Sequence, residues 1–272
     1  RFLAADVPPM GYKAYAIRGL NAAAHKANEK LTGETIENEF YRLTVGPLTG
    51  SIKSLFDKVA KRELADANAG RGVNEYLYVS GGEGTLMMNH TFGTPPANLT
   101  LTAPEGGQII ENVKSPLGHR IVVVAKSKNT PSIRSEYLLY DRLKRVDIVN
   151  TIEKDETRAK EAVYFAFPFA AAKPALEYQI QNGWCRPNDD QMPGACREWF
   201  TPQNLVHVQD GEFGIAWSTP DAPLVTLTDI NRGKWLEHLP INNGHVYSYA
   251  LNNYWFTNYR AQQGGRFVFR YS

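Results

Sequence analysis

Apolar and polar residues alternate in short runs along most of the chain, and a period of two residues is typical of a β-strand with one buried face. The alternation is clearest in residues 37–66, where one run covers 40–45 and a second begins at 52. The segment 46–50 (GPLTG) separates the two runs. Because glycine and proline of this kind mark turns, the stretch predicts a β-hairpin.

Similar runs recur from Glu34 to the end of the chain. They cover residues 76–79, 108–113, 119–125, 133–140, 146–152, 214–218 and 267–271. Short strands separated by turn residues at this spacing predict an all-β fold, a large antiparallel sandwich. Very little helix is expected, since residues 155–162 (DETRAKEA) are short and polar and fit a single helical turn or a loop.

The N-terminal residues predict a different kind of segment. Residues 1–20 contain a Pro-Pro pair, which favours an extended backbone, and predict a first strand after it. Residues 21–35 show no period and predict a loop. A chain of 272 residues fits one large all-β domain. We therefore assign 1–33 to a linker and leading strands from a preceding domain, and 34–272 to the β-sandwich domain.

Charge is nearly balanced, with 30 Lys and Arg against 28 Asp and Glu and a net charge of +2. This balance argues against nucleic acid and against an anionic membrane as partners. No window approaches the ~18 apolar residues of a membrane span. The 14 Tyr, 12 Phe and 5 Trp suit half-buried sheets more often than sugar-stacking surfaces. The chain begins with Arg and no signal-peptide pattern follows, so we expect a mature or truncated piece.

The two cysteines, Cys185 and Cys196, have ten residues between them. A disulfide closing this loop would indicate an exported or periplasmic protein. Two free thiols fit the sequence equally well, so the compartment stays open. Because no histidine cluster lies near the cysteines, a structural zinc site is not expected.

No catalytic constellation stands out in the sequence. A glycosidase needs two carboxylates about 5 to 10 Å apart, and 28 acidic residues give no basis for choosing a pair. The acidic pairs 155–156 and 189–190 fit solvated loops. The chain lacks Gly-x-Ser-x-Gly, His-Glu-x-x-His and Walker-type motifs. His90, with Glu75 or Glu83, could transfer protons on a sugar ring, although a loop or core histidine is the commoner case.

Two segments carry the residue types of sugar recognition, in which rings stack on pyranose faces and planar polar groups bind hydroxyls. Residues 183–208 mix Trp184, Trp199 and Phe200 with arginine, aspartate and amide side chains. A long loop held by its own tryptophans fits this segment equally well. Residues 250–272 interleave asparagine and glutamine with aromatic rings. These amides fit either the ordered corner of a sandwich, which is the commoner case, or a ligand-facing surface.

Four ordered segments resemble the C-terminal β-domain of family 38 glycoside hydrolases, the α-mannosidases. They are residues 37–58, 186–200, 214–225 and 252–265, with VPPMGYKAY (7–15) before them and FVFRYS (267–272) after them. The resemblance implies a galactose-mutarotase-like β-supersandwich. In that family an N-terminal α/β barrel holds a zinc ion and the catalytic carboxylates, and nothing in this chain resembles the barrel. We therefore expect no catalytic residue, no metal ligand and no cofactor here, with zinc confined to the absent barrel.

The resemblance also implies a function. The chain would be the non-catalytic β-domain of an α-mannosidase-like glycosidase, inactive alone, which shapes the substrate pocket and stabilises a catalytic barrel of the same polypeptide. Its partners would be that barrel and an α-mannoside-type glycan. Tyr76 lies in a segment similar to the family's substrate-facing tyrosine. The implied substrate-binding residues are Tyr76, Arg197, Trp199, Gln203 and Asn204.

Two other interpretations stay open, because a fold alone does not choose a function. One is a stand-alone sugar epimerase or mutarotase-like enzyme that uses His90. The other is a carbohydrate-binding module that binds sugar through exposed Trp184, Trp199 or Trp255.

Overall fold

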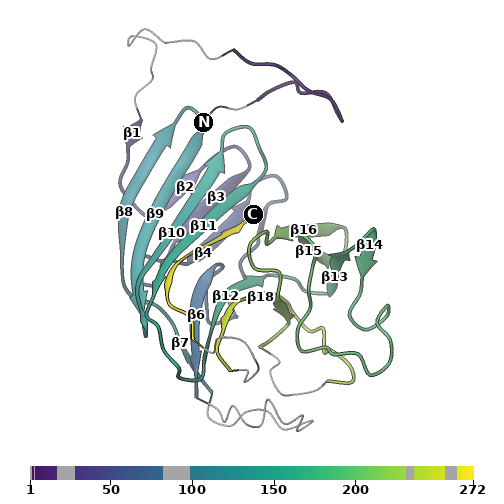
Figure 1. Cartoon of the computed structure of the whole chain (residues 1–272). Helices are drawn as coiled ribbons and strands as arrows, with labels where there is room; N and C mark the ends of the chain where they lie inside the picture. The colour runs from purple at the N-terminus through teal and green to yellow at the C-terminus, as the bar shows by residue number, and fades with distance from the viewer. Residues whose placement is uncertain (1, 3, 17–27, 82–98, 231–235, 255–261) are drawn as a thin grey trace.

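The computed structural model describes residues 2, 4–16, 28–81, 99–230, 236–254 and 262–272. These ranges contain strands and no helix, and every strand pair among them is antiparallel. Figure 1 shows a broad curved sheet, a second layer beside it and a small sheet at one end. The predicted all-β antiparallel sandwich with very little helix is therefore confirmed for the described residues.

The broad sheet has six strands in the order β1-β8-β9-β10-β11-β19. Their bounds are β1 Glu29–Lys30, β8 Glu105–Ser115, β9 Gly118–Ser127, β10 Thr130–Tyr140, β11 Val146–Lys154 and β19 Gly265–Tyr271. Strand β11 shows how the sequence pattern positions the sheet. Ile148, Asn150, Ile152 and Lys154 are buried, and the residues between them are more exposed. One face of β11 therefore points into the molecule, and two polar side chains on that face need partners there.

The second layer is a five-stranded sheet in the order β17-β18-β12-β6-β7. Its strands are β6 Glu75–Ser80, β7 Thr100–Thr102, β12 Glu161–Phe169, β17 Val225–Leu227 and β18 Gly244–Asn252. All nine residues of β12 are buried. Phe165 and Phe167 belong to the main core, whereas Tyr164 and Ala166 belong to a second hydrophobic cluster on the other face. Strand β12 is thus covered on both sides.

Two four-stranded sheets complete the described fold. The first, in the order β2-β3-β4-β5, consists of β2 Thr35–Glu37, β3 Tyr41–Val45, β4 Ile52–Asp57 and β5 Arg62–Glu63. The second, in the order β14-β13-β15-β16, consists of β13 Pro174–Ile180, β14 Gly183–Cys185, β15 Leu205–Asp210 and β16 Phe213–Ser218. Strands β3 and β4 are the predicted hairpin, and in its turn the Gly50 N–H donates to the Gly46 carbonyl at 2.9 Å.

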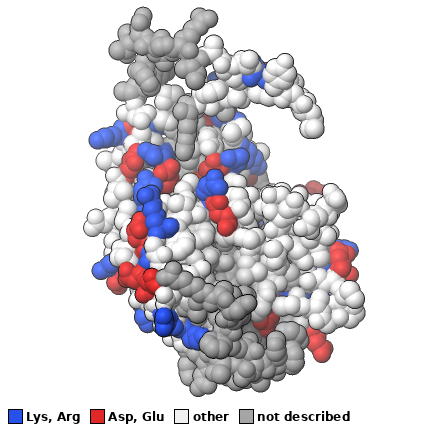
Figure 2. Space-filling view, viewed as in Figure 1, with Lys and Arg blue, Asp and Glu red and all other residues white. Residues whose placement is uncertain are grey.

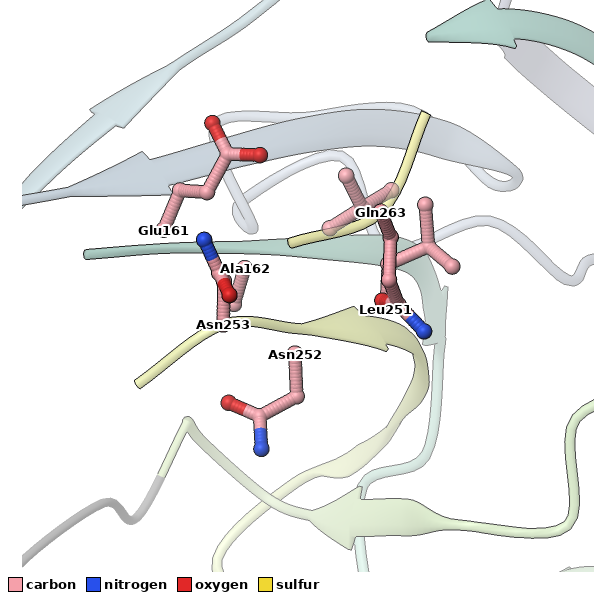
Figure 3. A pocket seen from close by; sticks show the side chains of 7 residues that line it. Glu161, Ala162, Leu251, Asn252, Asn253 and Gln263 are labelled. Carbon is pink, nitrogen blue, oxygen red and sulfur yellow. The ribbon is translucent and has the colours of Figure 1, made fainter. Parts of the chain in front are cut away.

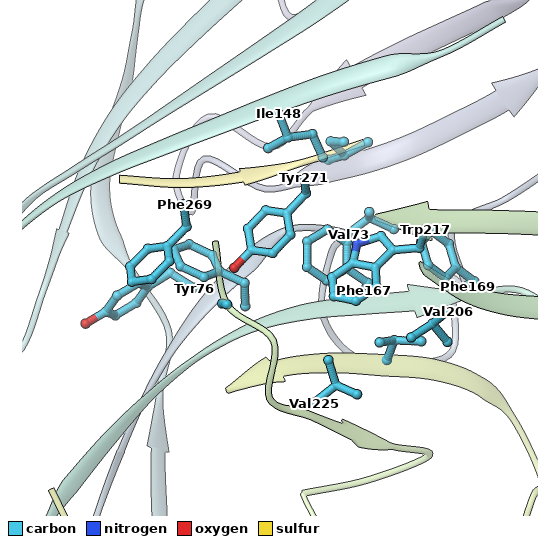
Figure 4. Close-up of a cluster of buried hydrophobic side chains, with 14 of the residues drawn as sticks. Val73, Tyr76, Ile148, Phe167, Phe169, Val206, Trp217, Val225, Phe269 and Tyr271 are labelled. Carbon is cyan, nitrogen blue, oxygen red and sulfur yellow. The ribbon is translucent and has the colours of Figure 1, made fainter. Parts of the chain in front are cut away.

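Large aromatic side chains join the layers. In Figure 4, Tyr76, Phe167, Trp217 and Tyr271 come together from β6, β12, β16 and β19. The Trp217 and Tyr271 rings stack with centroids 5.5 Å apart, and Phe167 lies 4.8 Å from Trp217 and 4.9 Å from Tyr271. Because burial of apolar surface is the dominant favourable term in folding, this cluster holds strands from three sheets in one unit.

The strand predicted within residues 1–20 is wrong for the part that the structure describes. Residues 4–16 form no strand and are exposed, and the Gly11 N–H donates to the Pro8 carbonyl in a turn. A strand needs a neighbour for its backbone polar groups, and in Figure 1 this segment lies apart from the sheets. The loop predicted for 21–35 is also interrupted, because Glu29 and Lys30 pair with β8 and β2 begins at Thr35.

Charged side chains of both signs gather over the broad sheet in Figure 2, and much of the rest of that face is uncharged. Lys and Arg lie next to Asp and Glu over the broad sheet, where Arg120 pairs with both Glu111 and Glu136. This mixture agrees with the small net charge of +2. No helix long and apolar enough to cross a membrane occurs in the described part of the chain.

Candidate functional site

Four of the five predicted substrate-binding residues lie on one segment, between β14 and β15. Arg197 is buried, Trp199 is half-buried, and Gln203 and Asn204 are exposed. The fifth, Tyr76, lies on β6 in the second layer. Four of them are thus neighbours in the chain, whereas Tyr76 lies in a different environment.

Arg197 makes its hydrogen bonds within its own segment. Its Nε donates to the Pro187 carbonyl and its Nη1 to the Ala195 carbonyl, both at 3.2 Å. The side chain is 5% exposed. A guanidinium bonded to backbone carbonyls on both sides of a loop fixes the path of that loop. The substrate contact implied by the family resemblance stays a prediction for Arg197.

Gln203 and Asn204 hold the end of the same segment against β13. The Gln203 N–H donates to the Gln179 carbonyl at 2.8 Å, and Asn204 Nδ2 donates to Gln179 Oε1 at 3.2 Å. Both side chains remain accessible at the surface. These amides are placed where they could also bind a hydroxyl group, since each amide has more donors and acceptors than it uses here.

An aromatic and polar platform lies next to these amides, on the outer face of the small sheet. It consists of Trp184, Glu177, Gln179 and His207. Trp184 is 45% exposed, and its ring lies 6.4 Å from the His207 ring, edge to face. His207 Nδ1 is 2.9 Å from Glu177 Oε1. An exposed ring beside planar polar groups is the arrangement that stacks on one face of a sugar and binds its hydroxyls.

The sequence pattern indicated Trp184 but missed the rest of this platform. Glu177 and His207 are paired only because β13 and β15 are neighbours, with Glu177 directly opposite His207. Gly214 on β16 leaves room for that ring, since a Cβ there would lie 2.3 Å from His207 Nε2. The alternating polar positions 177 and 179 were a signal for an outward face, but the partner strand could not be identified from them.

Tyr76 lies inside the sandwich, in the cluster of Figure 4. Its side chain is 1% exposed, its ring packs edge to face on Phe165 at 5.7 Å, and its hydroxyl lies 2.6 Å from Thr130 Oγ1. Burial raises the pKa of the phenol well above its usual value. The described contacts are thus those of a core residue, and the substrate-facing role stays a prediction.

Tyr76→Phe should lower the free energy of unfolding by about 1–2 kcal/mol, because it leaves the fully buried Thr130 hydroxyl without its partner. Tyr12→Phe is the matched control, since Tyr12 is 88% exposed and a change there is expected to stay within about 0.5 kcal/mol. Urea unfolding of both variants measures the difference. Equal midpoints for the two would show that the Tyr76 hydroxyl has no structural role.

A buried charged group lies where β11 ends and β12 begins. Lys154 Nζ is 2.5 Å from Glu161 Oε1, with side chains 1% and 5% exposed. The Tyr78 hydroxyl donates to Glu161 Oε2 at 2.5 Å, and Asn129 Nδ2 donates to the same oxygen at 3.2 Å. Burial, and then the Glu161 carboxylate, raise the pKa of Tyr78. Lys154 thus has the partner that its inward position requires.

Glu161 also lines a small pocket with the asparagines of the C-terminal motif (Figure 3). Asn253 Nδ2 donates to the carbonyls of Thr157 and Ala159, at 2.9 and 2.7 Å. Asn252 Oδ1 accepts hydrogen bonds from the Tyr249 hydroxyl and the Tyr254 N–H. Both amides therefore order a corner of the sandwich.

No group of three or more His, Cys, Asp or Glu side chains that could hold a metal ion occurs among the described residues. The zinc expected in a catalytic barrel stays a prediction about another domain. Cys185 and Cys196 are free thiols. Of the residues proposed for an epimerase, His90 and Glu83 lie outside the described part of the chain, as does Trp255 of the binding-module interpretation.

Comparison with solved structures supports the class of fold. An α-mannosidase from Enterococcus faecalis V583 superposes with a TM-score of 0.62 and 14% sequence identity, over 94% of this chain and 30% of that one. A galactose mutarotase-like protein from Lactobacillus casei ATCC 334 superposes with a TM-score of 0.51 and 13% identity, over 87% of this chain and 97% of that one. At these identities the likeness shows the fold alone, and the chain spans less than a third of the mannosidase.

The family is shown by the sequence itself. The family model for the glycosyl hydrolases family 38 C-terminal domain matches residues 36–219. This chain belongs to that family. A comparison with curated proteins finds no match.

Proposed function

We propose that this chain is the non-catalytic C-terminal β-domain of an α-mannosidase-like glycosidase. The domain shapes the substrate pocket and stabilises an N-terminal catalytic barrel of the same polypeptide. The glycan bound by the whole enzyme is of the α-mannoside type, and the barrel supplies the zinc ion and the catalytic carboxylates.

One observation carries this proposal, namely the match of residues 36–219 to the family 38 C-terminal domain. The structural likeness supports it, since 94% of this chain superposes on only 30% of an α-mannosidase. The remaining length of such an enzyme has room for a barrel. The four residues of the 197–204 segment are those that we propose for the rim of its pocket, together with Tyr76.

The intact mass of the protein expressed from the parent gene tests this domain arrangement. We expect a mass of roughly three times the 30.5 kDa of this chain, because the domain spans 30% of the mannosidase that it matches. A mass near 30.5 kDa would contradict the proposal and favour a stand-alone enzyme or binding module.

The platform on the small sheet favours a second candidate function, carbohydrate binding by the domain itself. Trp184 is exposed beside the Glu177–His207 pair and close to the exposed amide of Asn204. An aromatic face with hydroxyl-binding groups at its edge suits a pyranose. This binding needs no partner domain, so it is measurable on the 272-residue chain.

Trp184→Ala should weaken the binding of an α-linked mannose oligosaccharide by about two- to tenfold, which corresponds to the loss of roughly 0.5–1.5 kcal/mol from one aromatic contact. Tyr12→Ala is the control, because it removes another exposed ring that belongs to no strand of the small sheet. Isothermal titration calorimetry gives both dissociation constants. If the two variants bind the sugar as tightly as the unaltered chain, the platform is not a sugar site.

A further inference from the structure

A cleft of about 620 Å³ lies between the turn of the β3–β4 hairpin and the segment that joins β5 to β6. None of the five predicted substrate-binding residues lines it. The residues that line it include Glu34, Thr49, Lys53, Asp66 and Arg71. The volume falls within the range of small-molecule sites, roughly 300–1,000 Å³.

The walls of the cleft are held by backbone contacts. The Gly107 N–H of β8 donates to the Leu48 carbonyl at 3.0 Å, which fixes the hairpin turn on the broad sheet. Opposite it, Ile52 and Val73 exchange two backbone hydrogen bonds of 2.8 and 2.9 Å. Gly72 fits closely there, since a Cβ on it would lie 2.7 Å from the Ile52 carbonyl oxygen. The cleft is therefore preformed, which lowers the entropy that a ligand must overcome.

Two cations of the cleft form no ion pair with any described residue. Arg71 is half-buried, and its guanidinium lies over the Tyr247 ring, 5.9 Å from the ring centroid. Lys53 projects from β4 and is exposed. The side chains of Arg71 and Lys53 therefore both have N–H groups that donate to no described residue. A partly desolvated guanidinium with unused donors is suited to bind a carboxylate or a phosphate.

The acidic groups near these cations have other partners or lie at the rim. Asp66 Oδ2 lies 2.8 Å from His245 Nε2, and its Oδ1 accepts from the Asn68 N–H at 2.9 Å. Glu75 lies below the wall, where its Oε2 accepts from the Gly72 N–H at 2.8 Å and from the Ser51 hydroxyl. Glu34 is exposed at the rim. Asp66 and Glu75 thus direct their oxygens to these partners, and among the described residues neither forms an ion pair with Arg71 or Lys53.

We propose that this cleft binds a small hydroxyl-bearing oxyanion, a sugar acid or a sugar phosphate. Arg71 binds the oxyanion through two of its N–H groups, and Lys53 adds a second positive charge from the facing strand. Thr49 and Glu34 offer a hydroxyl and a carboxylate to the sugar hydroxyls. The small side chains at 65, 67, 70 and 72 leave the space that a ring occupies.

The proposal that the cleft binds an oxyanion depends on Arg71 and Lys53 alone. The proposal that the ligand is also a sugar rests on the proposed function. The site is separate from the pocket rim at 197–204 and from the platform around Trp184. A parent enzyme without α-mannosidase activity would end the proposed function and leave the binding of an oxyanion to the cleft unaffected.

The test is titration calorimetry on the 272-residue chain with four probes: glucuronate, mannose 6-phosphate, inorganic phosphate and mannose. We expect glucuronate or mannose 6-phosphate to bind at least tenfold more tightly than mannose, and the stronger of the two identifies the oxyanion as carboxylate or phosphate. Inorganic phosphate should bind more weakly than mannose 6-phosphate. Equal affinity for mannose and the two charged sugars, or no binding of either charged sugar, would overturn the proposal.

The Arg71→Gln variant tests whether the charged sugar binds in this cleft. It should weaken binding of the charged sugar about tenfold or more, whereas Arg142→Gln, which removes the same charge from an exposed turn outside the cleft, should change it less than twofold. The unfolding midpoint of each variant shows that it is folded. Lys53→Gln, at an exposed position, gives the same comparison should Arg71→Gln fail to fold. Unchanged affinity in the folded Arg71 variant, or in the Lys53 variant in its place, would overturn the assignment.

Discussion

Lys154→Met is expected to lower the free energy of unfolding by about 3–5 kcal/mol, because it leaves the Glu161 carboxylate buried without its countercharge. The two side chains are 2.5 Å apart and almost wholly buried. Tyr78 and Asn129 would still donate to Glu161, but neither carries a charge. Removing one member of a buried ion pair is among the most destabilising single changes, and urea unfolding measures it.

Two further variants isolate the ion pair from other effects. Lys173→Met makes the same chemical change at an exposed position and should stay within about 0.5 kcal/mol of the unaltered chain. The double variant Lys154→Met/Glu161→Gln removes both charges and should recover part of the loss, since no uncompensated charge is then buried. A Lys154 variant as stable as the Lys173 variant would contradict the buried pair.

Phe167→Ala is expected to cost about 3–5 kcal/mol of unfolding free energy, since it removes a fully buried ring and leaves a cavity. The ring is 1% exposed and packs against both Trp217 and Tyr271 (Figure 4). Because these rings come from different sheets, the cavity would weaken the contact between layers as well as β12. Thermal and urea unfolding both report the loss.

Val268→Ala is the control for this core substitution. Val268 belongs to β19, the strand that also carries Tyr271, but its side chain is 45% exposed. Its truncation should change stability by no more than about 0.5 kcal/mol. A Phe167 variant that unfolds at the same urea concentration as the Val268 variant would show that the core in Figure 4 does not hold the layers together.

The strands could be predicted because their signal is local. The runs at 133–140 and 146–152 became β10 and β11, and the GPLTG turn became the turn between β3 and β4. Alternation reports which residues face inward, whatever the partner strand is. The strand predicted within 1–20 was wrong for residues 4–16, which pair with no strand of the described part of the chain. A β-strand requires a neighbour, and no local pattern supplies it.

The candidate sites depended on contacts that sequence alone could not give. Glu177 meets His207 because β13 and β15 pair, and Arg71 meets Tyr247 because a segment before β6 lies against β18. Such pairs are distant in the chain and need the strand order to be known. Trp184 could be predicted as a candidate from its residue type and surroundings, but whether it was exposed depended on which face of the small sheet it occupied.

The hydrolysis of an aryl α-mannoside by the purified 272-residue chain, measured beside the full-length parent protein, tests the central claim most directly. We predict turnover by the parent and none by the chain, because the proposed function assigns the catalytic carboxylates and the zinc ion to the barrel. Measurable turnover by the chain alone would contradict the claim that this β-domain is non-catalytic.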